Sequence, residues 1–468
     1  MAKSWVNSAE VLGADLHLEL SGAGSRRAAL TRVLREAVRS GRLAPGARLP
    51  PYRSLAADLG IARNTVADAY AELVAEGWLT ARQGSGTRVA AGTGPTAPVP
   101  RRTVPESARR PVHDLTQGRP DPSAFPRAAW LASARRALSA APHDAFGPGD
   151  PRGRVELREA LAEYLARTRG ARSGPDRIVI CSGAAHGLRL LAGVVGRRWA
   201  VEAYGLPFHR GLLTSAGAVT TPLAVDAHGA EVAALRRENA VLLTPAHQFP
   251  TGGPLGPRRR AAAVEWARAA GGLVVEDDYD GEFRYDRQPV GALQSLDPEM
   301  VALLGSVSKS LSPTLRLGWM VLPERLVEPV LAAKGEREQW SSATEQLTLA
   351  DFLTSGSYDR HVRRMRQRYR RRRDRLTEVL AERAPGVGVS GIAAGLHAVL
   401  ELPPGTERSV VKAASWQGLA VEGLAGYRHP ESTERRDGLV VGYATPTDHG
   451  YAAALDALCR ALPPGATA

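Results

Sequence analysis

The sequence predicts two structural units: a small all-α unit completed by a β-hairpin, and a large α/β unit whose mainly parallel sheet has helices on both faces. Three observations predict this division. Apolar residues recur at helical spacing in three short segments between residues 30 and 76, and two β-rich segments follow. Residues 91–112 are rich in proline, glycine and arginine and lack periodicity. From residue 113 onward, short apolar runs alternate with helical patterns, which is typical of α/β folds.

Composition sets limits on the class of protein. The 468-residue chain allows two or three domains, and its hydrophobic content of 44% is that of a globular protein. A net charge of +13 favours a polyanionic partner such as nucleic acid. The two cysteines, Cys181 and Cys459, are too few and too far apart for a disulfide framework or a zinc site. The cysteine usage indicates a reducing compartment, the N-terminus has no apolar h-region, and no run of 18 apolar residues occurs, so we expect a cytoplasmic protein without a membrane span. We also expect no bound metal.

The N-terminal unit is expected to span residues 15–90. Its first helix ends near Gly41, its second follows Pro50 and Pro51, and its third runs from about Arg63 to Glu76. Two strands, at 77–80 and 86–89, would flank a Gly-Ser-Gly tip. Three helices followed by a hairpin define a winged helix-turn-helix.

This arrangement fits duplex DNA. The third helix would lie in the major groove, with Arg63 and Asn64 able to bond guanine and adenine edges, respectively. A generic three-helix bundle with a polar first turn is the alternative. The expected DNA contacts are Arg53, Arg63, Asn64, Thr65, Tyr70, Ser85, Gly86 and Thr87, although Tyr70 also falls on the inward face of the third helix.

Several strings within residues 15–90 resemble the GntR family of winged-helix regulators. They are Gly-Arg-Leu-Ala-Pro-Gly-Ala-Arg-Leu-Pro at 41–50, Arg-Asn-Thr-Val at 63–66, Ala-Tyr at 69–70, Glu-Gly-Trp-Leu at 76–79 and Gly-Ser-Gly-Thr at 84–87. Pro51 departs from the serine usual in the family. That loses a cap of roughly 1 kcal/mol, but proline suits a first helical turn.

Residues 91–112 are expected to be a linker. As a coil it would span roughly 25 Å, and about 70 Å as an extended polyproline II segment. The DNA-binding unit could therefore rest on the large unit of its own chain or of a partner chain.

In the large unit, expected to span residues 113–468, polar or small residues follow each apolar strand. The strands at 178–181, 241–244, 273–276 and 301–304 all end this way. Because open α/β sheets bind ligands at the carboxyl ends of their strands, we expect these residues to form one site.

Lys309 is the central residue of that site. It is the only lysine between Lys3 and Lys334 in a chain that prefers arginine, which suggests that the amine itself is needed. An amine can bond covalently to an aldehyde, whereas a guanidinium cannot. Ser306, Ser308 and Arg316 could hold a phosphate beside it. A surface lysine in a serine-rich turn is the alternative.

A pyridoxal phosphate bound by Lys309 would need further partners. Asp277 could face the pyridine nitrogen and Tyr279 the phenolic oxygen. The expected phosphate cradle is Ser182, Gly183, Ala184, Ser306, Ser308 and Arg316. The acidic run 276–282 could instead bind Mg²⁺, but no Gly-Lys-Thr phosphate loop accompanies it.

The large unit resembles a fold-type I aminotransferase, and the whole chain resembles the MocR/GabR-type regulators, in which a GntR winged helix is fused to such a domain. The matching strings are Thr244–Gly252, Glu276–Tyr285, Gly305–Gly318 and Ala394–His397. The resemblance implies that Lys309 is the cofactor-binding lysine, that Asp277 and Tyr279 contact the ring, and that Arg316 binds the phosphate. We also expect His247 and Tyr204 to lie beside the cofactor.

The sequence departs from the family at three places. Leu206 replaces a tyrosine that lies against the cofactor ring, with Tyr204 or Phe208 as possible substitutes. Phe249 replaces the asparagine of aminotransferases, as in the regulators. The last strand, Leu439–Tyr443, lacks the usual carboxylate-binding arginine, and the nearest arginines are Arg428, Arg435 and Arg436, which we expect to bind the effector.

These observations favour a regulator that binds pyridoxal phosphate and double-stranded operator DNA. The effector would be an amino compound or pyridoxal phosphate itself, and a homodimer would present two winged helices. The rival interpretation is a working aminotransferase that carries a DNA-binding module. A third is a purely structural cofactor.

An arginine-rich run, Arg360–Arg375, has the pattern of one helix with Val362, Met365, Tyr369 and Leu376 inward. Its outer face could be a solvated surface or could contact DNA beside the operator.

Overall fold

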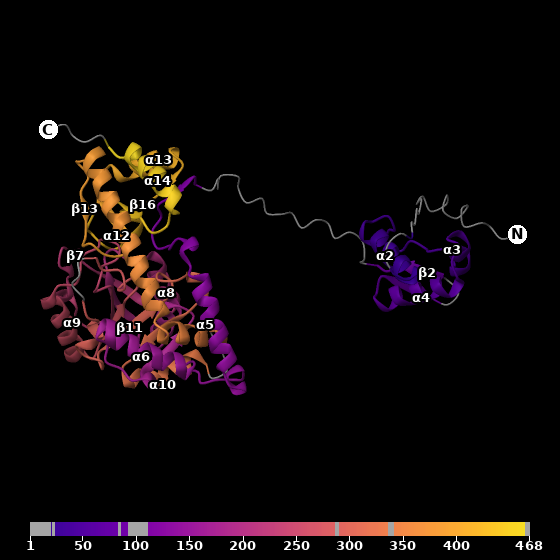
Figure 1. Ribbon diagram of the computed structural model, residues 1–468, viewed down its shortest axis with the longest axis horizontal. Helices are drawn as coiled ribbons and strands as arrows, with labels where there is room; N and C mark the ends of the chain where they lie inside the picture. Colours follow the sequence, from indigo (N-terminus) through magenta and orange to yellow (C-terminus); the bar gives the residue numbers. More distant parts are fainter. Residues whose placement is uncertain are drawn as a thin grey trace. The chain divides into compact units, whose positions relative to one another are not determined.

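The computed structural model describes residues 20, 24–82, 86–91, 111–285, 290–335 and 341–463. The chain divides into two compact units, residues 1–109 and 110–468 (Figure 1). Within the described residues, no helix combines the length and the apolar character that crossing a membrane requires.

The N-terminal unit has the expected three helices and hairpin. Its elements are α2 (Arg26–Arg39), α3 (Tyr52–Asp58), α4 (Arg63–Ala75), β1 (Leu79–Arg82) and β2 (Gly86–Val89). The strands pair antiparallel, with Leu79 opposite Val89. Leu30, Leu34, Leu55 and Leu73 are buried in one core, because the apolar positions of all three helices face the same side. Pro51 is the N-cap residue of α3 and makes no side-chain hydrogen bond, because its side chain has no acceptor.

A seven-stranded sheet forms the centre of the large unit. In spatial order the strands are β4 (Ile178–Cys181), β12 (Gly318–Val321), β11 (Val301–Ser306), β10 (Leu273–Asp277), β9 (Ala240–Leu243), β5 (Arg198–Glu202) and β6 (Val219–Leu223). Strand β12 runs antiparallel to both of its neighbours, and the other pairs are parallel. The sheet is therefore mainly parallel, as predicted.

Helices cover both faces of this sheet, as the alternation along β4 makes clear. Ile178 and Ile180 pack in one core with helices α6 (Val155–Arg169) and α11 (Ala343–Thr354). Val179 and Cys181 pack in another core with helices on the opposite face. The remaining helices of this part are α5 (Arg127–Ala140), α7 (Ala184–Val194), α8 (Pro207–Ser215), α9 (Pro257–Ala270) and α10 (Glu324–Lys334).

The C-terminal part of the large unit has a sheet and core of its own. Helix α12 (Ser357–Arg383) leads into it from the seven-stranded sheet (Figure 1). Tyr358 and Val362 of α12 belong to a core of the large sheet, whereas Met365 and Tyr369 belong to the C-terminal core. The other elements are β13 (Val389–Ser390), β14 (His397–Glu401), α13 (Glu407–Trp416), β16 (Glu422–Gly423), β17 (Gly438–Gly442) and α14 (Asp448–Ala461). Two short pairs complete the unit, β3 (His113–Asp114) with β15 (Leu419–Ala420) and β7 (Val225–Asp226) with β8 (Gly229–Ala230).

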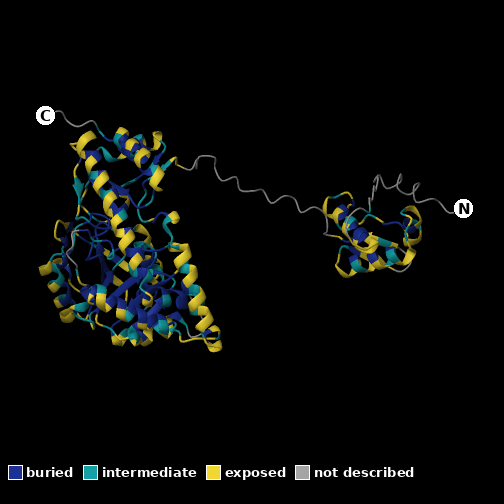
Figure 2. Ribbon diagram, viewed as in Figure 1, coloured by how far each residue is buried: buried dark blue, intermediate teal, exposed yellow. Residues whose placement is uncertain are grey.

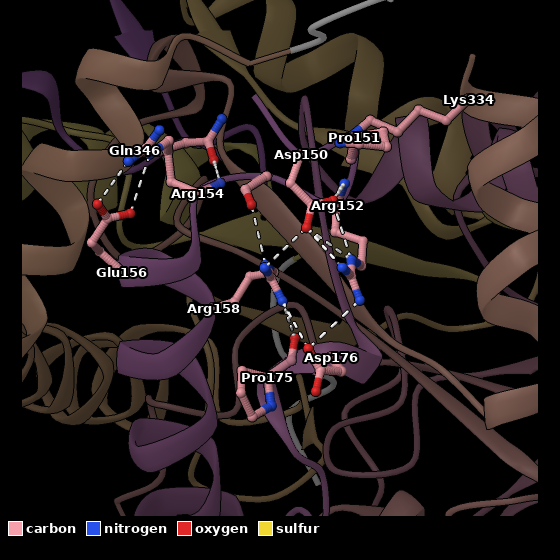
Figure 3. A network of polar contacts seen from close by, with 11 residues as sticks. Asp150, Pro151, Arg152, Arg154, Glu156, Arg158, Pro175, Asp176, Lys334 and Gln346 are labelled. Atoms are coloured by element: carbon pink, nitrogen blue, oxygen red, sulfur yellow. Dashed lines mark hydrogen bonds and ion pairs between the residues drawn. The ribbon is translucent and has the colours of Figure 1, made fainter. Parts of the chain in front are cut away.

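A polar network covers the free edge of β4 (Figure 3). Arg158 donates to the carbonyl oxygens of Gly153 and Pro175 and to Asp150. The loop that these bonds hold reaches the strand, because the Ile180 amide donates to the Arg152 carbonyl at 2.8 Å. An exposed strand edge is thereby satisfied by side chains and loop backbone. The network fixes the strand that leads into Ser182 and Gly183.

Candidate functional site

The strand ends that we expected to form one site lie side by side. Asp277 ends β10 and is opposite Leu304 of β11, while Ser306 of β11 is opposite Gly318 of β12. Gly318 is in turn opposite Cys181, the last residue of β4. This register brings the three polar segments after β4, β10 and β11 to one edge of the sheet.

The Lys309 side chain is enclosed at this edge. Its Nζ donates to the carbonyl oxygen of Gly118 at 2.6 Å. A Cβ on Gly118, whose φ is +80°, would lie 2.9 Å from Nζ, so the backbone approaches the amine closely. Burial lowers the pKa of Lys309, and the nearby Asp277 and Asp280 carboxyls oppose that shift. A lowered pKa makes the neutral, nucleophilic amine more available.

Lys334, in the same unit, is a lysine with a structural role and can be compared with Lys309. It is also buried, and burial lowers its pKa. Its Nζ, however, donates to two carbonyl oxygens, those of Pro151 and Ile180, and so belongs to the network that holds β4 (Figure 3). Lys309, in contrast, lies among carboxyl groups at the ends of the parallel strands.

Asp277 is a buried carboxyl with an open hydrogen-bonding position. Its Oδ1 is completely buried and has no hydrogen-bond partner among the described residues. Its Oδ2 lies 3.6 Å from Nδ1 of His209. Burial raises the pKa of Asp277 to about 7, with Asp278 adding to the rise and Lys309 opposing it. A buried oxygen without a partner is costly, so this position is suited to a ligand N–H.

His209 was not predicted from the sequence. It lies on α8, in the first turn after Leu206, and lines a pocket with Asp277 and Tyr279. Burial lowers the pKa of His209 to about 4, so the ring is neutral at physiological pH. The sequence signal that could have indicated His209 was its position at the start of the helix that follows strand β5.

The expected phosphate cradle is assembled from β4, β11 and β12. Gly183 has φ of +94° and precedes the first turn of α7, whose N–H groups have no intrahelical partners. A Cβ on Gly183 would lie 3.5 Å from a guanidinium nitrogen of Arg316. Arg316 itself has φ of +54° and donates to the Ser182 carbonyl oxygen. The Ser308 amide lies 3.4 Å from Ser306 Oγ. The Arg316 cation thus lies beside the turn that starts α7, and the strand register brings Ser306 to the same edge of the sheet.

Tyr279 lies in a second polar cluster beside Asp277. Its Oη is 2.9 Å from Nδ1 of His247, and the same nitrogen is 2.8 Å from Oδ2 of Asp280. Gly395, with φ of +76°, permits this arrangement, because a Cβ there would lie 2.4 Å from the His247 ring. His247 is therefore beside Tyr279, in contact with its hydroxyl group.

The acidic run after β10 does not converge on one point. Glu276 accepts from the amides of Leu293 and Gln294, and Asp278 forms a two-bond ion pair with Arg169. Tyr358 donates to Glu282. Within the described part of the chain, no group of three or more potential ligand residues could hold a metal ion. The Mg²⁺ alternative has no support in this geometry.

An apolar cluster lies next to Tyr279. Phe249, Val440, Tyr427 and Tyr204 are buried in it, and the Phe249 ring meets the Tyr279 ring edge-on at 5.6 Å between centroids. Val440 belongs to β17, the last strand, which lacks the carboxylate-binding arginine usual in the family.

Tyr204 is not brought to the pocket. Its ring is fully buried in the apolar cluster, and its hydroxyl group accepts from the Arg436 amide at 3.1 Å. Phe208 is 61% exposed. Leu206, in contrast, lines the pocket with His209 and Asp277. The expectation that Tyr204 lies beside the cofactor is corrected, because packing against β17 turns its ring away.

The three arginines expected to bind the effector also lie apart from the pocket. Arg428 donates to the carbonyl oxygens of Ser432 and Glu434. Arg436 pairs with Glu401 at 3.7 Å, and Arg435 is exposed. None of the three is among the described residues that line the pocket.

In the N-terminal unit, the start of α4 faces solvent. Arg63 and Asn64 are exposed, Thr65 is half-buried, and Arg53 on α3 is exposed. Gly86 has φ of +81° and lies in β2 with Thr87, while Ser85 lies outside the described residues. These positions leave side chains from both helices of the helix-turn-helix free to meet DNA.

Tyr70 requires a correction. Its ring is 4% exposed and its hydroxyl group donates to the Pro50 carbonyl oxygen at 3.0 Å. It therefore holds α4 against the segment before α3, and its side chain is not available to DNA. The helical spacing had placed Tyr70 on the inward face of the third helix, and that indication was correct.

Comparisons with known proteins agree with this description. Residues 27–89 match the model of the bacterial regulatory proteins of the gntR family, and residues 111–434 match aminotransferase class I and II. The pyridoxine biosynthesis transcriptional regulator PdxR of Corynebacterium glutamicum is 34% identical over 421 residues, which cover 89% of this chain and 91% of PdxR. The probable rhizopine catabolism regulatory protein MocR of Rhizobium meliloti is 31% identical over 443 residues, or 89% of each chain.

The solved structures extend the comparison to the fold. The α-aminoadipate aminotransferase LysN of Thermus thermophilus, complexed with N-(5'-phosphopyridoxyl)-L-leucine, has 24% identity and a TM-score of 0.67, covering 75% of this chain and 91% of LysN. The two units thus define a DNA-binding transcriptional regulator with an aminotransferase-type domain. The chain belongs to the MocR-type regulators of the GntR family.

The cofactor of this class is pyridoxal 5'-phosphate, and the residues present fit it. The open Oδ1 of Asp277 suits a protonated ring nitrogen, and Lys309 supplies the amine. The cradle formed by Gly183, Ser306 and Arg316 suits a phosphate group.

Proposed function

We propose that this protein is a transcription regulator whose operator binding responds to occupancy of the Lys309 site by pyridoxal phosphate. In this proposal residues 15–90 bind DNA, residues 91–112 are the linker and residues 113–468 are the sensing domain. The protein would act in the cytoplasm as a homodimer. A ligand shifts such a system only by its differential affinity for two conformations.

The observation that carries the proposal is the contrast between the two sides of the site. On the cofactor side, Asp277 ends β10, Lys309 follows the adjacent parallel strand β11, and Oδ1 of Asp277 has no hydrogen-bond partner among the described residues. On the other side, the buried Val440 and Phe249 belong to an apolar cluster that packs against Tyr279. Apolar side chains offer no counter-charge to the carboxylate of an amino acid. Arg210 also lines the pocket, but its guanidinium donates to the carbonyl oxygens of Gly205, Tyr427 and Arg428. This favours the cofactor over an amino acid as effector, in line with the similarity to PdxR, a pyridoxine biosynthesis transcriptional regulator.

In the proposed site, each residue has a defined task. Bound pyridoxal phosphate supplies an aldehyde for covalent attachment and a ring that withdraws electrons. Lys309 provides the neutral amine, and Asp277 holds a proton at the ring nitrogen. His209 stays neutral beside Asp277, so it leaves the carboxylate charge available to the ring. Arg316, Ser306 and Ser308 hold the phosphate, and Tyr279 donates to the phenolic oxygen.

The test is operator binding at controlled cofactor occupancy. Duplexes selected by the full-length protein from a random pool would be footprinted without cofactor and with pyridoxal phosphate. We expect the affinity or the footprint to change with the cofactor and to be unresponsive in Lys309→Ala. Identical footprints in wild-type protein shown by its visible absorbance to be loaded would refute the proposal.

A working aminotransferase is the second candidate, and the proximity of Lys309, Asp277 and Tyr279 favours it. Multiple-turnover amino transfer to a 2-oxo acid at about 1–10³ s⁻¹ would support this alternative. Amino compounds that change the footprint more than pyridoxal phosphate does would identify them as the effector class.

A further inference from the structure

The described surface has a concentration of arginine on α12. This 27-residue helix contains eleven arginines and four acidic residues. Two of the arginines are structural, because Arg368 and Arg372 are held by Asp121 and Asp448. The outer side of α12 is exposed along its length (Figure 2).

A groove runs between this outer side and the start of α5. We call it the arginine groove and define it by Arg127 on α5 and by Arg364, Arg368 and Arg371 on α12. Its free volume is about 600 Å³, and Asp448 is the acidic residue in its described lining. Asp448 accepts from Arg368 and Arg372, which neutralise its charge.

Three cations in the groove remain available to a partner. Arg127, Arg364 and Arg371 are exposed, and none has an ion-pair partner among the described residues. Arg364 lies 3.1 Å from His361, whose pKa is lowered to about 4 by burial, so that ring is neutral. Exposed cations without counter-charges on two facing elements favour an anionic partner.

The start of α5 adds to this preference. Its first turn contains no acidic residue, and Pro126 provides no side-chain cap. Ala128 and Ala129 are exposed and small, so the first-turn N–H groups can be approached closely. Backbone N–H groups at a helix start favour phosphate oxygens, which here would lie opposite Arg364 and Arg371.

The spacing of the cations favours a polymer over a single small anion. Arg364 and Arg371 are seven residues apart, which is about 10.5 Å along a helix. Successive phosphates of one DNA strand advance about 3.4 Å along the duplex axis, so three steps cover about 10 Å. A DNA backbone therefore offers each of the two side chains a separate phosphate, whereas a single small phosphate offers one anion to both.

We propose that the arginine groove binds the phosphate backbone of the duplex whose operator sequence the winged helix recognises. Its contacts are with phosphates, so they add affinity without sequence preference. The linker joins the two DNA-binding surfaces covalently, which raises the effective concentration of the groove at DNA already bound by α4.

The experiment compares two full-length triple variants with the wild type. Arg127→Gln, Arg364→Gln and Arg371→Gln together remove the free charges of the groove. Arg237→Gln, Arg258→Gln and Arg408→Gln form the control, since all three are exposed and lack ion-pair partners among the described residues. Both variants lose three charges. Circular dichroism and the visible absorbance of bound pyridoxal phosphate check that both are folded.

Fluorescence anisotropy with a random-sequence duplex of about three helical turns would be recorded over a series of KCl concentrations. Each lost phosphate contact lowers the slope of log K against log salt by about 0.9, so the groove variant should lose about 2 to 3 units of slope. The control variant should keep the wild-type slope.

Preference for operator over random duplex should survive in both variants, because Arg63 and Asn64 are unchanged. Equal slopes in the groove and control variants would overturn the proposal, as would a groove variant that loses operator preference but keeps the slope.

Discussion

Replacement of Asp277 by asparagine should stabilise the cofactor-free protein while weakening its hold on pyridoxal phosphate. The carboxyl is 4% exposed, and burial raises its pKa to about 7. An unfolded aspartate has a pKa of about 3.9, so the difference is about 3 pH units. At about 1.4 kcal/mol per unit, the ionised form costs at most about 4 kcal/mol of folding stability. Asparagine avoids this charge but keeps a polar group in the same buried position, and we expect a gain of about 1–3 kcal/mol.

The size of this stability gain depends on pH. A carboxyl whose pKa is raised on folding carries no penalty below about pH 4, where it is protonated in both states. The penalty grows as the pH rises toward the folded pKa of about 7 and is complete above it. Asp277→Asn should therefore match the wild type near pH 4 and exceed it in stability at pH 8.

Urea unfolding followed by tryptophan fluorescence measures this difference, since Trp199 and Trp319 are buried in the large unit. Asp226→Asn is the matched control, because Arg259 lowers the pKa of that exposed carboxyl and its loss should slightly destabilise the protein at pH 8. Pyridoxal phosphate should stabilise the wild type much more than Asp277→Asn, because its ring nitrogen fills the open hydrogen-bonding position of Oδ1. If Asp277→Asn is as stable as the wild type at pH 8, or less stable, the Asp277 carboxylate does not destabilise the folded protein, and the reasoning is refuted.

Further substitutions test other parts of the molecule. Lys309→Ala should abolish covalent attachment of the cofactor, which borohydride reduction followed by peptide mapping would detect; a labelled peptide elsewhere would contradict the assignment. Gly118→Ala places a methyl group 2.9 Å from the Lys309 amine at φ of +80°, a strain of about 1–3 kcal/mol, and should lower cofactor affinity about 10- to 100-fold, whereas Gly426→Ala, which meets nothing within 4 Å, should not. Arg63→Ala and Asn64→Ala should each weaken operator binding by about 1–3 kcal/mol and relax sequence preference, whereas Tyr70→Phe should cost about 1 kcal/mol of stability by losing its bond to Pro50 and leave operator preference intact.

Most of the fold could be predicted because its signals are local. The apolar run before Gly305 has the length and composition of a buried strand, and the structure places β11 at Val301–Ser306. Lys309 and Asp277 could be expected to meet, because parallel strands bring their carboxyl ends to one edge. The three helices of the N-terminal unit were likewise indicated by apolar spacing and by glycine and proline at their ends.

The residues that escaped prediction depend on contacts distant in sequence. Tyr204 lies between Glu202 and Gly205, which line the pocket, but its burial is decided by packing against β17, more than 200 residues later. Arg428 and Arg436 are close to the last strand in sequence, yet local carbonyl oxygens and Glu401 hold their guanidinium groups. His209 has no distinctive neighbours in the sequence. Its proximity to Asp277 arises from the fold, which brings the start of α8 to the pocket at the end of β10.

Helix α12 has one further consequence. It is about 40 Å long at 1.5 Å per residue, and it is anchored in two different cores, by Tyr358 and Val362 at one end and by Tyr369 and Leu376 farther along. Because α12 is one uninterrupted helix that packs in both cores, a rotation of the C-terminal part relative to the seven-stranded sheet must also move α12. Arg364 lies close to the junction of the two anchorages and Arg371 lies within the second, so the same rotation would displace both. If the C-terminal part closed slightly toward the seven-stranded sheet around a ligand, the exposed arginines of α12 would move with the helix.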